Sequence, residues 1–131
     1  MPDVLSEKAR ELIGRPVLAS LATLNPDGSP QVTPLWVGLD GDDLLFNTAE
    51  GRIKARNLHR DPRVGVTVID PDDAYNVVAV RGTVVDLTTE GADTHIDELA
   101  HKYLGTDYPA RREGEVRIKV RVRTDHIAMG G

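Results

Sequence analysis

Residues 17–39 read VLASLATLNPDGSPQVTPLWVGL, and this stretch decides the fold class. Two largely apolar runs flank Asn25-Pro26-Asp27-Gly28, which is typical of a tight turn because proline fixes φ and glycine supplies a positive φ. We therefore expect a strand over 17–24 that turns straight back as a second strand over 31–39. A tight turn cannot connect parallel neighbours, so a doubly wound parallel sheet is disfavoured.

Pro34 lies inside the second run and cannot donate a hydrogen bond to a strand ladder. The strand over 31–39 is therefore expected at a sheet edge, at a bulge, or against a ligand.

Further strands alternate with short helices along the rest of the chain. Strands are expected at 44–47, 63–69, 75–85 and 116–123, and Gly82 is expected to form a bulge or bend. Helices are expected where the apolar period is 3.6, after the capping Ser6, over 51–60, and from Ile96 to Tyr103. About six strands with short helices between them predict a mainly β protein, a closed or nearly closed antiparallel barrel.

Composition limits the function classes. The 131 residues, 40% of them hydrophobic, fit a single domain spanning 1–131. A formal net charge of −5 gives no global basic field for nucleic acid, and the absence of cysteine excludes disulfides and thiolate catalysis. No apolar run approaches the roughly 20 residues that span a bilayer, and the first residues lack a secretion signal, so a cytoplasmic location is expected. Metal binding is not expected, because no ligand spacing links the histidines, His59, His95, His101 and His126.

Basic residues open the helix expected over 51–60. A helix N-terminus presents unpaired N–H groups and a partial positive charge, and Arg52, Lys54 and Arg56 add full charges. One interpretation is a phosphate site for a cofactor; the other is a solvated helix face with Ile53 and Leu58 turned toward the core.

Residues 48–64, TAEGRIKARNLHRDPRV, resemble the signature stretch of the flavin-binding split-barrel superfamily of pyridoxamine 5′-phosphate oxidase-like proteins. They are most similar to the actinobacterial branch that depends on the 5-deazaflavin coenzyme F420. Further family features follow in order: ASLAT at 19–23, NPDGSP at 25–30, TPLW at 33–36 and RGTV at 81–84. The resemblance implies a six-stranded antiparallel split β-barrel with short peripheral helices. It also implies a homodimer with cofactor sites at the subunit interface.

The resemblance further implies a cofactor site drawn from four segments of the chain. These are Thr33, Pro34, Leu35 and Trp36; Asn47 and Thr48; Arg52, Lys54, Arg56 and Asn57; and Tyr75 and Asn76. The first segment is expected to follow the isoalloxazine ring, the second to touch the ribityl side, and the third to hold the phosphate, chiefly through Arg52 and Lys54. Tyr75 and Asn76 are expected from the partner subunit.

Two features allow more than one interpretation. Trp36 is expected either to pack in the core or an interface, or to stack beside the cofactor ring. Four basic residues alternate with valine and isoleucine on the last strand: Arg117, Lys119, Arg121 and Arg123. They predict a solvated strand face, or a basic stripe that holds the oligoglutamate tail of a deazaflavin.

The implied activity is a coenzyme F420-dependent oxidoreductase that transfers a hydride between the reduced cofactor and a small organic acceptor. One alternative is an FMN-binding oxidoreductase of the pyridoxamine 5′-phosphate oxidase type, although residues 124–131 lack the Arg-x-His-Asp-Arg-like motif of vitamin B6 oxidation. Another is a non-catalytic flavin or haem carrier on the same scaffold. The pattern identifies no catalytic side chain beyond Tyr75 as a candidate proton donor.

Overall fold

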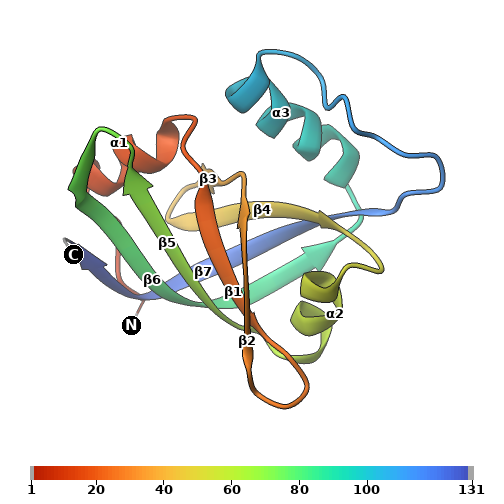
Figure 1. The fold of residues 1–131 in the computed structure, drawn as a ribbon, viewed down its shortest axis with the longest axis horizontal. Coiled ribbons are helices and arrows are strands. Elements are labelled where there is room, and N and C mark those ends of the chain that lie inside the picture. Colours follow the sequence, from red (N-terminus) through yellow and green to blue (C-terminus); the bar gives the residue numbers. More distant parts are fainter. Residues whose placement is uncertain (1, 130–131) are drawn as a thin grey trace.

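Seven strands and three helices follow one another within residues 2–129, the part of the chain that the computed structural model describes (Figure 1). Their bounds are α1 (Glu7–Gly14), β1 (Ala19–Leu24), β2 (Pro30–Leu35), β3 (Gly38–Asp40), β4 (Asp43–Ala49), α2 (Ile53–Arg60), β5 (Arg63–Asp70), β6 (Asp73–Thr88), α3 (Ala92–Leu104) and β7 (Arg117–Met129). The predicted turn joins β1 to β2 as an antiparallel pair, with Gly28 at a φ of 86°. None of the helices described is long and apolar enough to cross a membrane.

One antiparallel sheet holds all the strands, in the order β2-β1-β5-β6-β7-β4-β3. The sheet curls strongly, and its edge strands β2 and β3 are consecutive in the sequence but are not hydrogen-bonded to each other (Figure 1). The barrel is therefore split along a seam between these two strands. Pro34 lies on edge strand β2, in one of the positions predicted for it.

The expected strand over 31–39 is two strands, so the prediction of six strands was wrong by one. The break falls at Val37, which is fully buried and whose backbone is bound by helix α3. Its N–H donates to Tyr103 Oη at 3.1 Å, and its carbonyl accepts from Lys102 Nζ at 2.7 Å. Because side chains from α3 take both backbone groups, the chain leaves the β1 ladder and β3 pairs with β4 instead.

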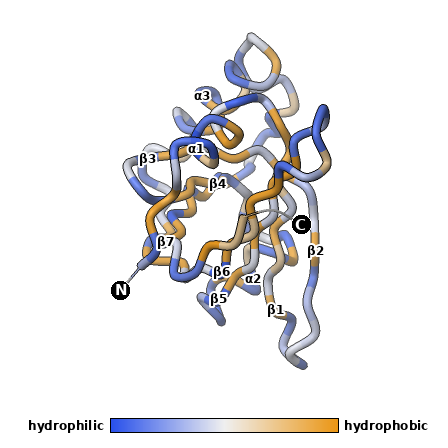
Figure 2. The backbone as a smooth tube through the Cα atoms, turned by 90° about the vertical axis from the view of Figure 1, so that its left-hand side faces the viewer, coloured by the Kyte–Doolittle hydropathy of each residue, from blue (hydrophilic) through white to orange (hydrophobic). Residues whose placement is uncertain are grey.

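The core fills the inside of the curled sheet. Alternation on β5 turns Val64, Val66 and Val68 inward, as their spacing predicts. Phe46 of β4 and Val120 of β7 meet them in the same cluster. Figure 2 shows the same alternation as hydrophobic and hydrophilic residues succeeding one another along the strands.

The helices cover different parts of this sheet. Ser6 caps α1 as predicted, accepting a hydrogen bond from the Ala9 N–H at 3.1 Å. Helix α1 packs near β3 and β5, α2 contacts β1 and β4, and α3 lies over β4 and β7 (Figure 1). Helix α3 buries the outer face of the last strand at its N-terminal end.

Strands β6 and β7 are longer than the predicted 75–85 and 116–123. They pair from Val78 with Met129 to Thr88 with Lys119, and this mutual pairing extends both. The register shifts between Arg81 and Gly82, which confirms the predicted irregularity at Gly82.

Candidate functional site

A cavity of about 260 Å³ lies where β2, β4, the start of α2, α3 and the segment before β7 come together. Six of the residues predicted for a cofactor site line it: Pro34, Leu35, Trp36, Asn47, Arg52 and Lys54. Five that were not predicted complete the lining: Leu18, Ile96, Leu99, Tyr108 and Arg117. The fold thus brings three of the four predicted segments to one place.

One end of the cavity is aromatic and aliphatic. Trp36 stacks on Tyr103 with ring centroids 5.2 Å apart, and the Tyr108 ring meets Trp36 edge-on at 6.0 Å. Trp36 therefore packs against a neighbour, which is one of the two roles considered from sequence, and it also borders the cavity. Its stacking beside a cofactor ring stays a prediction. Such a surface suits a flat aromatic ligand.

The other end carries positive charge. Lys54 is half-buried, and burial together with the charges of Arg52 and Arg117 lowers its pKa below the ordinary value for lysine. Within residues 2–129, no carboxylate lies at salt-bridge distance from Lys54. A partly desolvated cation beside two others is costly unless an anion joins them, so this end is suited to a phosphate.

The interpretation of the last strand as a solvated basic face is wrong at Arg117, which is buried. Helix α3 covers its end of β7, and the side chain is only 3% exposed. The guanidinium donates to Asn47 Oδ1 at 2.9 Å and to Glu115 Oε1 at 2.9 Å, and it lies 5.1 Å from the centroid of the Tyr108 ring. The sequence feature that could have predicted this burial was the apolar stripe on α3, because such a stripe packs against a face of the sheet.

The other basic residues of this strand differ among themselves. Arg121 contacts Asp40 and Asp43, and Arg123 contacts Asp125. Among the residues that the structure describes, only Lys119 of the four has no carboxylate partner. A role for this face in binding a cofactor tail stays a prediction.

Asn47 connects the cavity to the start of α3. Its amide nitrogen donates to the Ala92 carbonyl at 2.9 Å and lies 3.1 Å from His95 Nδ1. Burial and the charges of Lys119 and Arg117 lower the pKa of His95 to about 4, so the ring is neutral at pH 7. With Nδ1 accepting, the proton resides on Nε2, which is buried and has no partner among the described residues. His95 is therefore a buried residue of α3, only 3% exposed.

Four further predicted residues do not line the cavity. The hydroxyls of Thr33 and Thr48 are buried and have no partner within the described chain. Arg56 is exposed on α2. Asn57 is buried and donates to Thr23 Oγ1 and Asn25 Oδ1, both at 3.0 Å, so it fastens α2 to the β1–β2 hairpin.

Tyr75 and Asn76 lie elsewhere in the protomer, near the turn between β5 and β6. In Figure 1 this turn is beside α1, on the side opposite α2. Tyr75 is 86% exposed, and Asn76 donates to Asp70 at 3.1 Å. Neither residue lines the cavity of its own chain.

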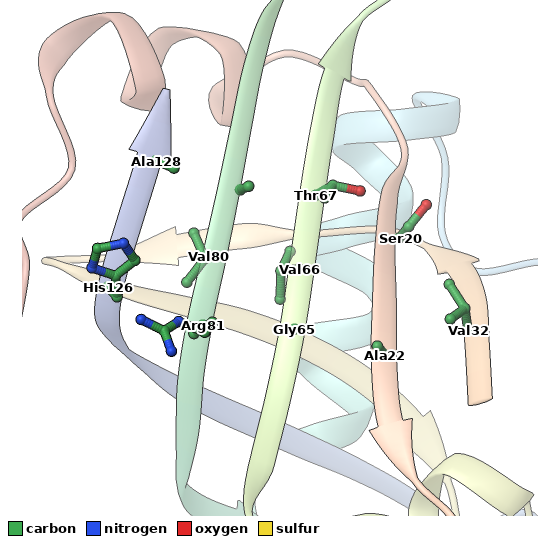
Figure 3. A pocket seen from close by; sticks show the side chains of 11 residues that line it. Ser20, Ala22, Val32, Gly65, Val66, Thr67, Val80, Arg81, His126 and Ala128 are labelled. Atoms are coloured by element: carbon green, nitrogen blue, oxygen red, sulfur yellow. The ribbon is translucent and has the colours of Figure 1, made fainter. Parts of the chain in front are cut away.

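A second hollow, of about 450 Å³, lies on the outer face of β2, β1, β5, β6 and β7. Figure 3 shows that small side chains line it, with Arg81 and His126 at one side. Its lining includes Ser20, Ala22, Gly65 and Ala128. A face of such short side chains permits close approach of another surface.

Comparisons with known proteins identify the family and the fold. A family model described as pyridoxamine 5′-phosphate oxidase matches residues 5–126. Among solved structures, an F420 reductase is 33% identical with a TM-score of 0.86, covering 95% of this chain and 98% of that chain.

Two more distant structures match the fold alone. A conserved hypothetical protein from Mycobacterium tuberculosis is 24% identical with a TM-score of 0.76, over 95% of this chain and 83% of that chain. HupZ of Group A Streptococcus is 18% identical with a TM-score of 0.70, over 95% of this chain and 98% of that chain.

Proposed function

The chain belongs to the pyridoxamine 5′-phosphate oxidase family, and from this premise we propose that it is an oxidoreductase that uses the deazaflavin coenzyme F420. The observation that carries the proposal is the cavity that joins an aromatic end to a partly buried cluster of three cations. The similarity to an F420 reductase supports the choice of a deazaflavin over a flavin.

The residues present fit such a cofactor. Arg52 and Lys54 are placed to bind its phosphate, and Trp36 and Tyr108 to contact its ring. Strand β2 is a sheet edge, so its outward backbone groups have no neighbouring strand and are free to bind ring oxygen and nitrogen atoms. The orphaned hydroxyl of Thr33, on the same face of β2 as Leu35, adds a further polar group beside the cavity.

The chemistry belongs chiefly to the cofactor. When bound, a reduced deazaflavin supplies a hydride to an electron-poor acceptor. The contribution of the protein is to hold ring and acceptor in contact and to exclude water from the apolar end, where Leu35, Ile96 and Leu99 lie.

We further propose that the active form is a homodimer whose subunits meet through the outer face shown in Figure 3. The cavity of one chain falls below the roughly 300–1,000 Å³ of typical ligand pockets, so the cofactor needs additional surface. The occupant of the outer face is a second copy, because the basic Arg81 there complements the exposed Asp73 at the β5–β6 turn. Tyr75 and Asn76, beside that turn, are the predicted contribution of the partner.

The experiment that tests the function is fluorescence titration of the purified protein with oxidised coenzyme F420 and, separately, with FMN. Saturable, tighter binding of coenzyme F420 is expected, followed by turnover of the reduced form with an electron-poor acceptor. Preference for FMN would assign the protein to flavin chemistry instead. Tight binding without turnover of any acceptor would indicate a carrier. The acceptor and the cytoplasmic location stay predictions.

A further inference from the structure

Glu115, in the segment that leads into β7, contacts two of the three cations at the cavity. Its Oε1 accepts from Arg117 Nη1 at 2.9 Å and lies 3.5 Å from Arg52 Nη2. The side chain is 9% exposed, and its second oxygen is buried without a partner among the described residues. Glu115 does not line the cavity, so its influence on a ligand there acts through charge and through the arginines.

The carboxyl group of Glu115 is ionised at neutral pH. Burial raises its pKa, but the hydrogen bond from Arg117 and the charges of Arg117 and Arg52 outweigh that effect and hold the pKa below the ordinary value. The three cations and this one carboxylate therefore leave the anion end with two net positive charges rather than three.

We propose that Glu115 is a specificity-determining residue that reduces the advantage of a phosphomonoester, with close to two negative charges, over a phosphodiester, with one, at this end of the cavity. A monoester carries close to two charges at pH 7.5, because its second pKa is about 6. Each ligand charge is repelled by the Glu115 carboxylate, so the dianion is penalised about twice as much as the monoanion. The inference rests on the proposed function and deepens it: FMN ends in a monoester, whereas the phosphate of coenzyme F420 lies within a diester.

The test compares FMN with its methyl ester, which has the same ring and one phosphate charge fewer. Dissociation constants are measured by fluorescence titration at pH 7.5 for the native protein and for Glu115→Gln, which keeps the hydrogen-bond acceptor but removes the charge. The affinity of FMN relative to its ester should rise about tenfold in Glu115→Gln, as for one unit charge removed at close range in an intermediate dielectric. The matched control is Glu113→Gln, an exposed residue of the same segment whose substitution should leave the ratio unchanged.

If Glu115 has only a structural role, Glu115→Gln should change the affinities for FMN and for its methyl ester by the same factor. An unchanged ratio of the two affinities would therefore overturn the proposal. Failure of both flavins and of coenzyme F420 to bind would overturn the proposed function but not this inference. In that case the role of Glu115 is tested by thermal shifts of the native protein and of Glu115→Gln with inorganic phosphate and with dimethyl phosphate, at matched ionic strength. Greater stabilisation by inorganic phosphate in Glu115→Gln than in the native protein supports the role of Glu115, and equal stabilisation refutes it.

Discussion

Lys54 is the cation at the cavity whose charge has no carboxylate neighbour within the described chain, so a ligand phosphate should gain most from it. Lys54→Ala should weaken binding of coenzyme F420 by about 1.5–3 kcal/mol, the usual value of a hydrogen bond to a charged group. Fluorescence titration checks this, with Lys8→Ala on the exposed face of α1 as the control. An unchanged dissociation constant would remove Lys54 from the site.

A second prediction at the scale of single residues is that His95 makes the folding stability of the protein depend on pH. In the unfolded chain its pKa is about 6.5, and in the folded protein it is about 4. Between these values the unfolded state binds a proton that the folded state does not. Stability should therefore be complete above pH 6.5 and fall by up to about 3 kcal/mol as the pH drops to 4. Urea unfolding across this range should show a shallower loss for His95→Gln than for the native protein; equal slopes would refute the assignment.

At the scale of elements, the close pairing of β6 with β7 at the register shift depends on Gly82. A Cβ there would lie 2.6 Å from Val122 Cγ1 and 2.8 Å from the Arg123 carbonyl oxygen, which is backbone and cannot move aside. Gly82→Ala should cost about 1–3 kcal/mol of unfolding free energy, the range for overpacking. Gly14→Ala is the matched control, because a Cβ at Gly14 meets no atom within 4 Å. Equal stability of the two variants in urea would show that the strands separate without cost.

At the scale of the whole molecule, the proposed dimer predicts that a substitution which disrupts the outer sheet face weakens both dimerisation and cofactor binding. Ala22→Arg places a long charged side chain on that face, within the hollow of Figure 3, and should yield monomers in sedimentation velocity. Coenzyme F420 should then bind more weakly. Tyr75→Ala should weaken binding while the dimer persists, and a monomeric native protein would refute the arrangement.

Short-range patterns in the sequence by themselves determined much of this protein. The turn before Gly28, the cap at Ser6 and the strand over 63–69, which is β5 with its alternating valines, all formed as predicted, because each depends on neighbouring residues or on a strict period. The family signature likewise indicated Arg52 and Lys54, which the fold places together at the cavity.

Only the tertiary structure decided the break at Val37 and the burial of Arg117. Val37 leaves its strand because Lys102 and Tyr103, 65 and 66 residues further along, bind its backbone. Arg117 belongs to a strand face that reads as solvated until α3 packs over it. The contact of Glu115 with Arg52 likewise joins residues that are far apart in the sequence. These features arise from contacts between distant segments, and no local period or propensity encodes which segments will meet.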